Sequence, residues 1–271
     1  MAAKKQLSWQ DRVRFRGHRG GVIAMHRALT RYVLSPADLV TAVLMVLLIS
    51  LIWLLLVPHV CDLWVRIMDY GIHSLPFHAQ LHISEHYVTS FLRFRIPFPS
   101  MEAVLPDAQI WRITGLTTLA IFIGTFFMPS QWIPVTYLLR GILFIQATAL
   151  VYFALIPAEF PHTPDSYLEG LLASGLAIIS ILPLLFGLTF FIFQFSMGQK
   201  IFLTALTMAH LVLFLPLQIL LQGLILQKTV LFMPVLYIVF GMPLDVLVII
   251  AFYAWGMTWN FRALEARAAA R

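Results

Sequence analysis

Six long apolar runs constrain this chain more than any other feature of its sequence. A helix needs about 20 consecutive apolar residues to cross the hydrocarbon core of a bilayer, and every run reaches that length. The links between the later runs are short, which favours antiparallel neighbours in a bundle. The sequence therefore predicts an all-α integral membrane protein that folds as a six-transmembrane-helix bundle. The expected spans are residues 38–57, 110–129, 134–156, 168–195, 201–225 and 230–259.

The composition excludes several other classes of protein. Hydrophobic residues make up 61% of the chain and charged residues only 11%. A soluble domain has about 25% charged residues, so a water-soluble globule of this composition would expose far too much apolar surface. A disordered chain is excluded for the same reason. The formal net charge of +6 does not indicate a nucleic-acid partner, because basic residues beside a membrane span are explained by membrane topology.

The first 36 residues form a basic segment ahead of the first span. Such a segment is expected at a cytoplasmic end under the positive-inside rule. We therefore expect residues 1–36 to be a basic, amphipathic cytoplasmic arm, with the N-terminus and the C-terminus both in the cytoplasm. The composition is rich in Arg and poor in Asn, which favours a bacterial cytoplasmic (inner) membrane. The arginines expected to contact lipid headgroups are Arg12, Arg14, Arg16, Arg19, Arg27 and Arg31.

Residues 37–271 are expected to form the membrane domain, with an outer subdomain at 58–109. Pro58 is expected to end the first span, and an amphipathic helix beyond it should lie on the outer surface. Charged and apolar residues alternate over 91–99, which predicts an extended segment. Aromatic and arginine side chains of this kind suit docking to a partner protein. The residues expected to dock such a partner are Phe91, Arg93, Phe94, Arg95 and Phe98.

Three histidines of the outer subdomain follow one another at a spacing of four. On a helix, His78, His82 and His86 share one face, and with Glu85 they could bind zinc, copper or haem iron. On a strand they also share one face, but they are spread over about 26 Å at about 3.3 Å per residue. A metal site and a plain polar surface therefore both stay open. No motif supports a specific cofactor.

Asp245 is the sharpest polar feature of the apolar runs, because it lies near the middle of the last one. A carboxylate at that depth costs about 2.5–3.5 kcal/mol, so it should face the bundle interior or a cavity. A proton or cation site explains it, and so does a structural carboxyl that binds a neighbouring helix. His210 lies at a similar depth in the fifth span and is its expected partner. The other intramembrane polar candidates are Gln218, Gln222 and Gln146.

Prolines distinguish the second half of the bundle from the first. None is expected inside the first three spans, whereas the later spans contain several. A proline inside a helix removes a backbone donor and tends to break the helix. We therefore expect discontinuous helices in the second half, as carriers have. The carbonyl freed by the proline of the fifth span should lie near its polar stripe. The prolines concerned are Pro183, Pro216, Pro234 and Pro243.

Three classes of function remain open. The first is a non-catalytic subunit or scaffold of a multi-protein bacterial envelope complex, bound to the bilayer and to other membrane or periplasmic proteins. The second is a small proton- or ion-coupled transporter that uses Asp245 and His210. The third is a membrane-embedded enzyme or metal site built on the outer His/Glu/Arg loop. The first is favoured over an enzyme, because no nucleophile-elbow, phosphate-binding or dinucleotide-binding motif is present.

Overall fold

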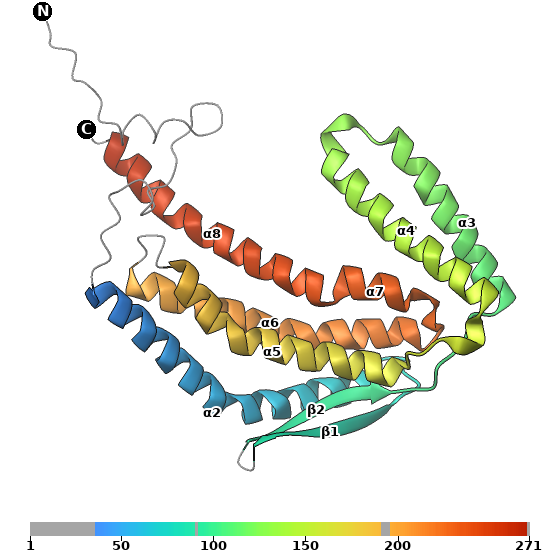
Figure 1. The fold of residues 1–271 in the computed structure, drawn as a ribbon, viewed down its shortest axis with the longest axis horizontal. Coiled ribbons are helices and arrows are strands. Elements are labelled where there is room, and N and C mark those ends of the chain that lie inside the picture. The colour runs from blue at the N-terminus through green and yellow to red at the C-terminus, as the bar shows by residue number, and fades with distance from the viewer. Residues whose placement is uncertain (1–35, 90–91, 191–195, 270–271) are drawn as a thin grey trace, which may run out of the picture. The chain divides into compact units, whose positions relative to one another are not determined.

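The chain has the architecture of a multi-pass membrane protein. The computed structural model describes residues 36–89, 92–190 and 196–269. Within them, six helical segments are long and apolar enough to cross a membrane, as expected. Their order is shown in Figure 1. The helices are α2 (Pro36–Ser74), α3 (Ala108–Gly124), α4 (Ile133–Leu155), α5 (Pro164–Phe190), α6 (Met197–Leu226), α7 (Met233–Phe240) and α8 (Met242–Ala269), the strands are β1 (Gln80–Thr89) and β2 (Leu92–Ser100), and the short 3-10 turns are η2 (Thr125–Phe127), η3 (Ser130–Trp132), η4 (Pro157–Glu159) and η5 (Val230–Phe232).

Residues 1–35 lie outside the described residues. The six arginines expected to contact lipid headgroups all fall in this segment, so their role stays a prediction. The remaining chain divides into two compact units, each of which is described by itself. Unit 1 comprises residues 36–55, 178–190, 196–210 and 248–269, and unit 2 comprises residues 56–177 and 211–247.

Unit 1 is held by aromatic and hydrogen-bonded contacts between its helices. The indole Nε1 of Trp53 on α2 donates to Ser180 Oγ on α5 at 2.8 Å. The Tyr253 ring of α8 lies against the rings of Phe186 and Phe190 on α5, at 6.0 Å in both cases. These contacts tie α2 and α8 to α5.

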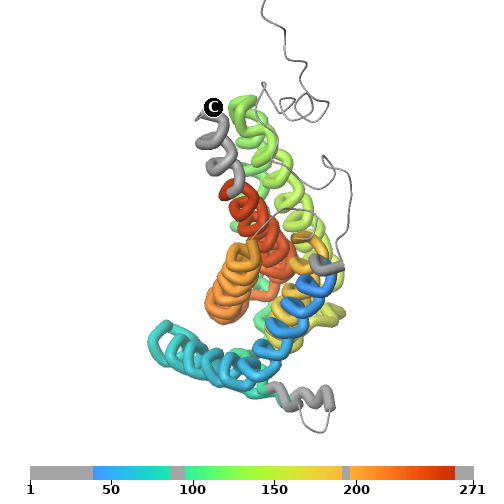
Figure 2. Tube along the Cα trace, turned by 90° about the vertical axis from the view of Figure 1, so that its left-hand side faces the viewer, coloured from blue at the N-terminus to red at the C-terminus, as the bar shows by residue number. Residues whose placement is uncertain are grey.

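Unit 2 contains the lateral hairpin formed by α3 and α4, which lie side by side in Figures 1 and 2. Helix α3 packs against α4 and the turn η2, and α4 also packs against α7 and η5. On α3 the only buried residues are Thr114 and Thr118. Small side chains spaced four apart let two membrane helices approach closely, which explains this contact.

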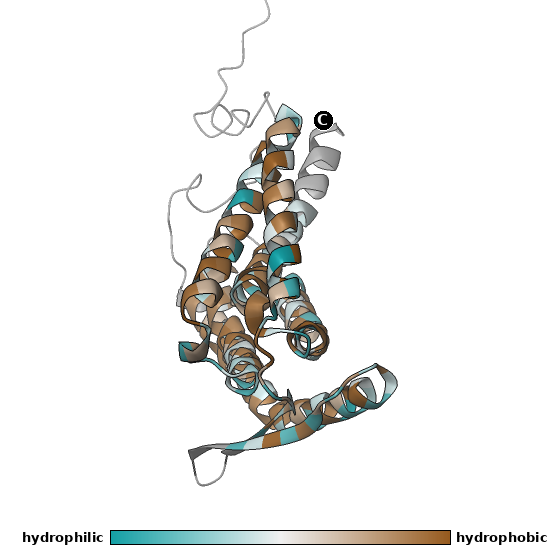
Figure 3. Ribbon diagram, turned by 90° about the vertical axis from the view of Figure 1, so that its right-hand side faces the viewer, coloured by the Kyte–Doolittle hydropathy of each residue, from teal (hydrophilic) through white to brown (hydrophobic). Residues whose placement is uncertain are grey.

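Apolar residues predominate along the helices, as the brown colour in Figure 3 shows, and many of their side chains are exposed. Leu55 on α2 and Leu116 on α3 are each 68% exposed, and Phe127 is 82% exposed. A soluble protein rarely exposes a contiguous apolar patch of this kind. Contact with lipid or with other membrane helices explains this surface, and it agrees with the composition.

The prediction that Pro58 ends the first span is wrong. Helix α2 runs through Pro58 without interruption to Ser74, so a proline does lie inside one of the first three spans. Pro183 and Pro216 likewise lie inside α5 and α6 without ending them. Proline already has a helical φ, and neighbouring groups in a membrane bundle can satisfy the carbonyl that it leaves free.

Pro216 shows how such a carbonyl is satisfied. The missing amide of Pro216 would have bonded the carbonyl of Val212, four residues earlier. The indole Nε1 of Trp64 donates to that carbonyl at 2.7 Å, and Trp64 is fully buried. The Val212 carbonyl therefore lacks a helical donor, as expected, and accepts a hydrogen bond from a side chain of α2 instead.

The amphipathic helix expected beyond the first span is the continuation of α2 itself. Asp62, Arg66, Asp69 and His73 are exposed along one stripe, as predicted. Trp64 is fully buried on the opposite stripe. The polar interval after the span is therefore an extension of one long helix.

A two-stranded antiparallel hairpin of β1 and β2 follows, so the description "all-α" omits this element. The extended conformation predicted for residues 91–99 is confirmed for the described part, and His82 and His86 lie in strand β1. The two strands pair edge to edge, with Ile83 opposite Pro97 and Glu85 opposite Arg95. A two-stranded sheet has only edges, so proline is tolerated in β2.

Asp165, at the start of α5, anchors the end of this hairpin. Its carboxylate accepts a hydrogen bond from Ser100 Oγ at 2.6 Å and one from the backbone N–H of Met101 at 2.9 Å. Ile96 and Phe98 of β2 are 3% and 4% exposed. Pro97 and Pro99, between and after them, are buried as well, so the last part of β2 is buried on both of its faces.

Candidate functional site

The last span is broken at Gly241, between α7 and α8. The backbone N–H of Gly241 bonds the carbonyl of Tyr237 at 3.1 Å, and the N–H of Leu244 bonds the carbonyl of Gly241 at 2.9 Å. Pro243 supplies no N–H, so the helical ladder is interrupted at this point. A Cβ atom at position 241 would collide with the Tyr237 carbonyl oxygen. Glycine is therefore required for the break.

Gln222 of α6 takes over the carbonyl that the break releases. In an unbroken helix the N–H of Leu244 would bond the carbonyl of Phe240, four residues earlier. Instead, Gln222 Nε2 donates to the Phe240 carbonyl at 2.9 Å. The Tyr167 hydroxyl of α5 donates to Gln222 Oε1 at 2.6 Å. Gln222 is fully buried, and its side chain joins three helices.

Asp245 lies in the first turn of α8, directly after the break. It is 3% exposed, and Gln218 is 4% exposed. Gln218 Nε2 donates to Asp245 Oδ1 at 3.2 Å. The N-terminal end of a helix carries a partial positive charge, which favours a carboxylate there. Gln218 is one helical turn from Gln222 on α6, so one stripe of α6 holds both polar contacts.

We call Tyr167, Gln218, Gln222, Asp245 and the Phe240 carbonyl the buried polar cluster. All of its members lie in unit 2. Its side chains donate to and accept from one another, which fixes the ends of α7 and α8 against α5 and α6. Sequence reasoning placed both glutamines and Asp245 on facing helices. Tyr167 was not among the predicted polar candidates, because nothing in the sequence links its hydroxyl to a residue 55 positions later.

His210 falls in unit 1, whereas Asp245 falls in unit 2. The predicted pairing of the two therefore stays a prediction. The His210 ring lies 5.2 Å from the ring of Phe252 on α8, centroid to centroid. With Trp255 it lines an apolar groove of about 410 Å³ between α6 and α8.

Gln146 of α4 does not join the buried polar cluster by any hydrogen bond. It is 5% exposed, and neither its amide oxygen nor its amide nitrogen has a partner in the described part of the chain. Two hydrogen bonds between α4 and the segment that contains α3 and η2 lie on either side of Gln146 along α4. Trp111 Nε1 donates to the Leu150 carbonyl at 2.8 Å, and Arg140 Nε donates to Thr125 Oγ1 at 2.9 Å.

The Arg140 guanidinium shows how a cation is held within the α3–α4 hairpin. Besides its bond to Thr125, it lies over the Phe126 ring, 4.4 Å from the centroid. Such cation–π contacts stabilise a charge that is partly removed from water. Arg140 thus lies inside a span, and its contacts with Thr125 and Phe126 were not predicted from the sequence.

The strand conformation separates the proposed metal ligands. Along β1, His82 and Glu85 point to opposite faces, since successive side chains alternate. The His82 ring lies 5.2 Å from the Phe98 ring. His78 precedes the strand, and the side chain of His86 lies outside the described ones. Among the described residues, no group of three His, Cys, Asp or Glu side chains could hold a metal ion.

The residues expected to dock a partner are only partly described. Arg95 is exposed, whereas Phe98 is 4% exposed and cannot reach a partner from the hairpin surface. The side chains of Phe91, Arg93 and Phe94 lie outside the described ones, so their role stays a prediction.

Comparisons with protein families, with curated proteins and with solved structures find no match to this chain. Its function must therefore be argued from its own residues.

Proposed function

We propose that this polytopic membrane protein is a non-catalytic subunit of a multi-protein membrane complex. The single observation that carries the proposal is the packing of α3. This helix is long and apolar enough to span a membrane, and it packs against α4 and η2 through one side, on which its only buried residues, Thr114 and Thr118, lie. Its remaining surface is apolar, with Leu116 68% and Leu119 56% exposed. A transmembrane helix from a partner protein can pack on that surface.

The buried polar cluster supports a structural role for the intramembrane polar residues. The side-chain amide of Gln222 accepts a hydrogen bond from the Tyr167 hydroxyl and donates one to the Phe240 carbonyl. Gln218 donates a hydrogen bond to Asp245. Polar side chains commonly join helices in this way inside a membrane. Under this proposal the cluster stabilises the break at Gly241, and the partner complex supplies the activity.

The proposal is tested by photo-crosslinking in living cells. A photoreactive p-benzoylphenylalanine is placed at Leu116 on α3 and, as a matched control, at Leu55 on α2, because both positions are 68% exposed. We expect one discrete protein adduct from position 116 and none from position 55. Adducts from neither position, or equal diffuse adducts from both, would show that α3 faces lipid and would overturn the proposal.

A small proton- or ion-coupled carrier is the second candidate, favoured by the position of Asp245. This carboxylate is buried at the start of α8, directly after a helix break, and carriers place such residues at their coupling sites. Asp245→Asn keeps the side-chain shape and the acceptor for Gln218. In this reading it abolishes ion-coupled uptake while expression stays normal. Uptake and growth that are unchanged in Asp245→Asn would exclude the carrier.

A further inference from the structure

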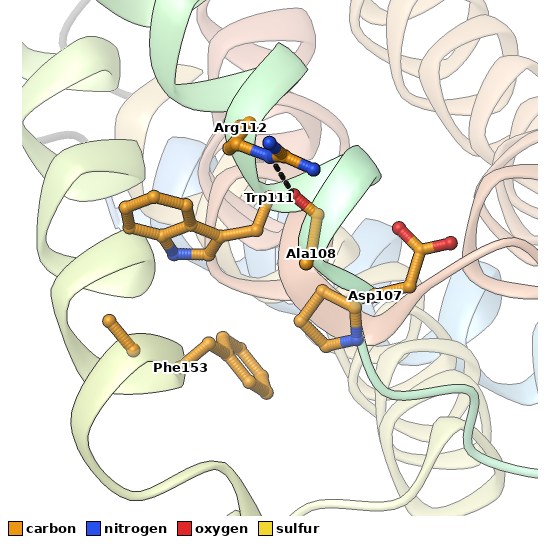
Figure 4. Close-up of a pocket in the computed structure, with 7 residues that line it drawn as sticks. Asp107, Ala108, Trp111, Arg112 and Phe153 are labelled. Atoms are coloured by element: carbon orange, nitrogen blue, oxygen red, sulfur yellow. Dashed lines mark hydrogen bonds between the residues drawn. The ribbon is translucent and has the colours of Figure 1, made fainter.

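The chain contains a preformed pocket at the start of α3, shown in Figure 4. Its volume is about 380 Å³. It lies where α3 begins and α4 ends, so it belongs to one end of the α3–α4 hairpin. Both helices have the length of a membrane span, which places this end at the level of the lipid headgroups. The residues that shape it are Pro106, Asp107, Trp111, Arg112 and Phe153.

Two aromatic rings form the apolar side of the pocket. Figure 4 shows the rings of Trp111 and Phe153 on the same side of the pocket. The Trp111 indole is fixed because its Nε1 donates to the Leu150 carbonyl at 2.8 Å. Phe153 is 5% exposed and lies 4.9 Å from the Phe160 ring. Both rings are therefore held in place, and little conformational freedom is lost when a ligand binds.

Opposite charges line the same pocket without neutralising each other. Asp107 caps α3, since its Oδ1 accepts from the backbone N–H of Ile110 at 2.6 Å. Arg112 Nε donates to the Ala108 carbonyl at 3.0 Å, which leaves the two terminal NH2 groups of the guanidinium for a ligand. Within the described part of the chain, neither Asp107 nor Arg112 has an ion-pair partner. The pocket therefore presents one separate anion and one separate cation.

This combination matches the chemistry of a zwitterionic lipid. A guanidinium binds a phosphate through paired N–H donors, and a carboxylate binds a primary ammonium through its N–H groups. A purely anionic headgroup would meet the Asp107 carboxylate, and a quaternary ammonium offers that carboxylate no N–H donor. The indole and phenyl rings suit the glycerol ester region and the first acyl carbons, because tryptophan is enriched at membrane interfaces.

We propose that this pocket binds a phospholipid with a primary-amine headgroup, of the phosphatidylethanolamine class. Arg112 holds the phosphate, Asp107 holds the ammonium, and Trp111 and Phe153 pack against the apolar part. The lipid then fills the interfacial end of the α3–α4 seam.

Native mass spectrometry of the full chain measures this binding. The purified protein is titrated with phosphatidylethanolamine, phosphatidylcholine and phosphatidylglycerol of identical acyl chains. Soluble glycerophosphoethanolamine is added as a competitor that carries the same headgroup without the chains. We expect phosphatidylethanolamine to bind about two- to fivefold more tightly than either other lipid, the range for partly exposed charge contacts. The soluble headgroup should compete poorly.

Two variants separate the two charges. Asp107→Asn removes the carboxylate but keeps the helix cap, because Asn caps as well as Asp. It should abolish the preference for phosphatidylethanolamine over phosphatidylcholine. Arg112→Gln should weaken all three lipids. Arg66→Gln, at an exposed arginine of α2, is the matched control and should change nothing.

Three results would overturn the proposal. The first is equal binding of the three lipids to the unaltered protein, which would indicate adventitious lipid only. The second is tighter binding of phosphatidylglycerol, which would indicate an anionic-lipid site. The third is an Arg112→Gln variant that binds every lipid as the Arg66→Gln control does.

Discussion

Replacing Trp64 with Phe should destabilise the protein because of a proline 152 positions away in the sequence. Trp64 donates its indole N–H to the Val212 carbonyl at 2.7 Å, and Pro216 is the reason that this carbonyl lacks a helical donor. Phenylalanine removes the donor, which leaves a buried carbonyl unpaired and costs about 1–3 kcal/mol. The smaller ring adds about 1 kcal/mol through lost packing. The total expected loss is about 2–4 kcal/mol.

A second substitution separates these two contributions. Pro216→Ala restores a backbone N–H that can bond the Val212 carbonyl from within α6. In that background, Trp64→Phe should cost only about 1 kcal/mol, the packing part. The coupling energy between the two substitutions is therefore about 1–3 kcal/mol. It measures the indole–carbonyl bond directly.

The assay is reversible unfolding in mixed detergent micelles, with the fraction unfolded measured at increasing mole fraction of a denaturing detergent. The four proteins of the cycle are compared under one condition, after circular dichroism shows that each retains its helical content. If Trp64→Phe costs the same in both backgrounds, the indole does not satisfy the carbonyl released by Pro216. The Trp64 indole would then not be the group that compensates for Pro216, and the corresponding role of Gln222 at the Phe240 carbonyl would lose support.

Three further perturbations test the buried polar cluster and the hairpin anchor by the same unfolding assay. Gln222→Leu removes two buried hydrogen bonds at nearly constant volume and should cost about 1–3 kcal/mol; an unchanged midpoint would contradict its bridging role. Gly241→Ala should cost about 1–3 kcal/mol because its Cβ meets a backbone carbonyl, whereas Gly141→Ala, at an open position, should be neutral; equal effects would contradict the close approach. Asp165→Ala should speed amide hydrogen exchange in β2 while leaving α6 unaffected, and uniform exchange in both would show that the carboxylate is not the anchor.

The sequence was sufficient for the number of candidate spans and for the burial of Gln218, Gln222 and Asp245. Hydrophobic runs of membrane length leave few alternatives, so the number of candidate spans follows from the pattern of these runs along the chain. The same argument places Asp245 in the interior, because exposure to lipid is costly. The stripe of Gln218 and Gln222 follows from helical spacing. These inferences depend on local sequence and on the bilayer.

The features that could not be predicted from the sequence are contacts between residues that lie far apart along the chain. Which group satisfies a carbonyl that is released at a proline or at a helix break depends on the other helices that pack there. At Pro216 that group is Trp64, and the helix continues; at Pro243 the break stands, with Gln222 on the Phe240 carbonyl. The pairing of β1 with β2 depends on a buried face that only the folded unit provides. The Tyr167 contact to Gln222 joins residues on different helices, and no local pattern reports it.

The central claim is that the α3 surface seats another membrane protein. Its most direct test is the mass of the particle that contains the tagged chain, expressed from its own locus and extracted in a mild detergent or polymer disc. The chain has a mass of 30.8 kDa. We predict a particle with a second membrane polypeptide in fixed stoichiometry, which dissociates when Leu116 is replaced by Trp and persists in the Leu55→Trp control. A particle that holds only one or two copies of this chain, unchanged by Leu116→Trp, would contradict the account.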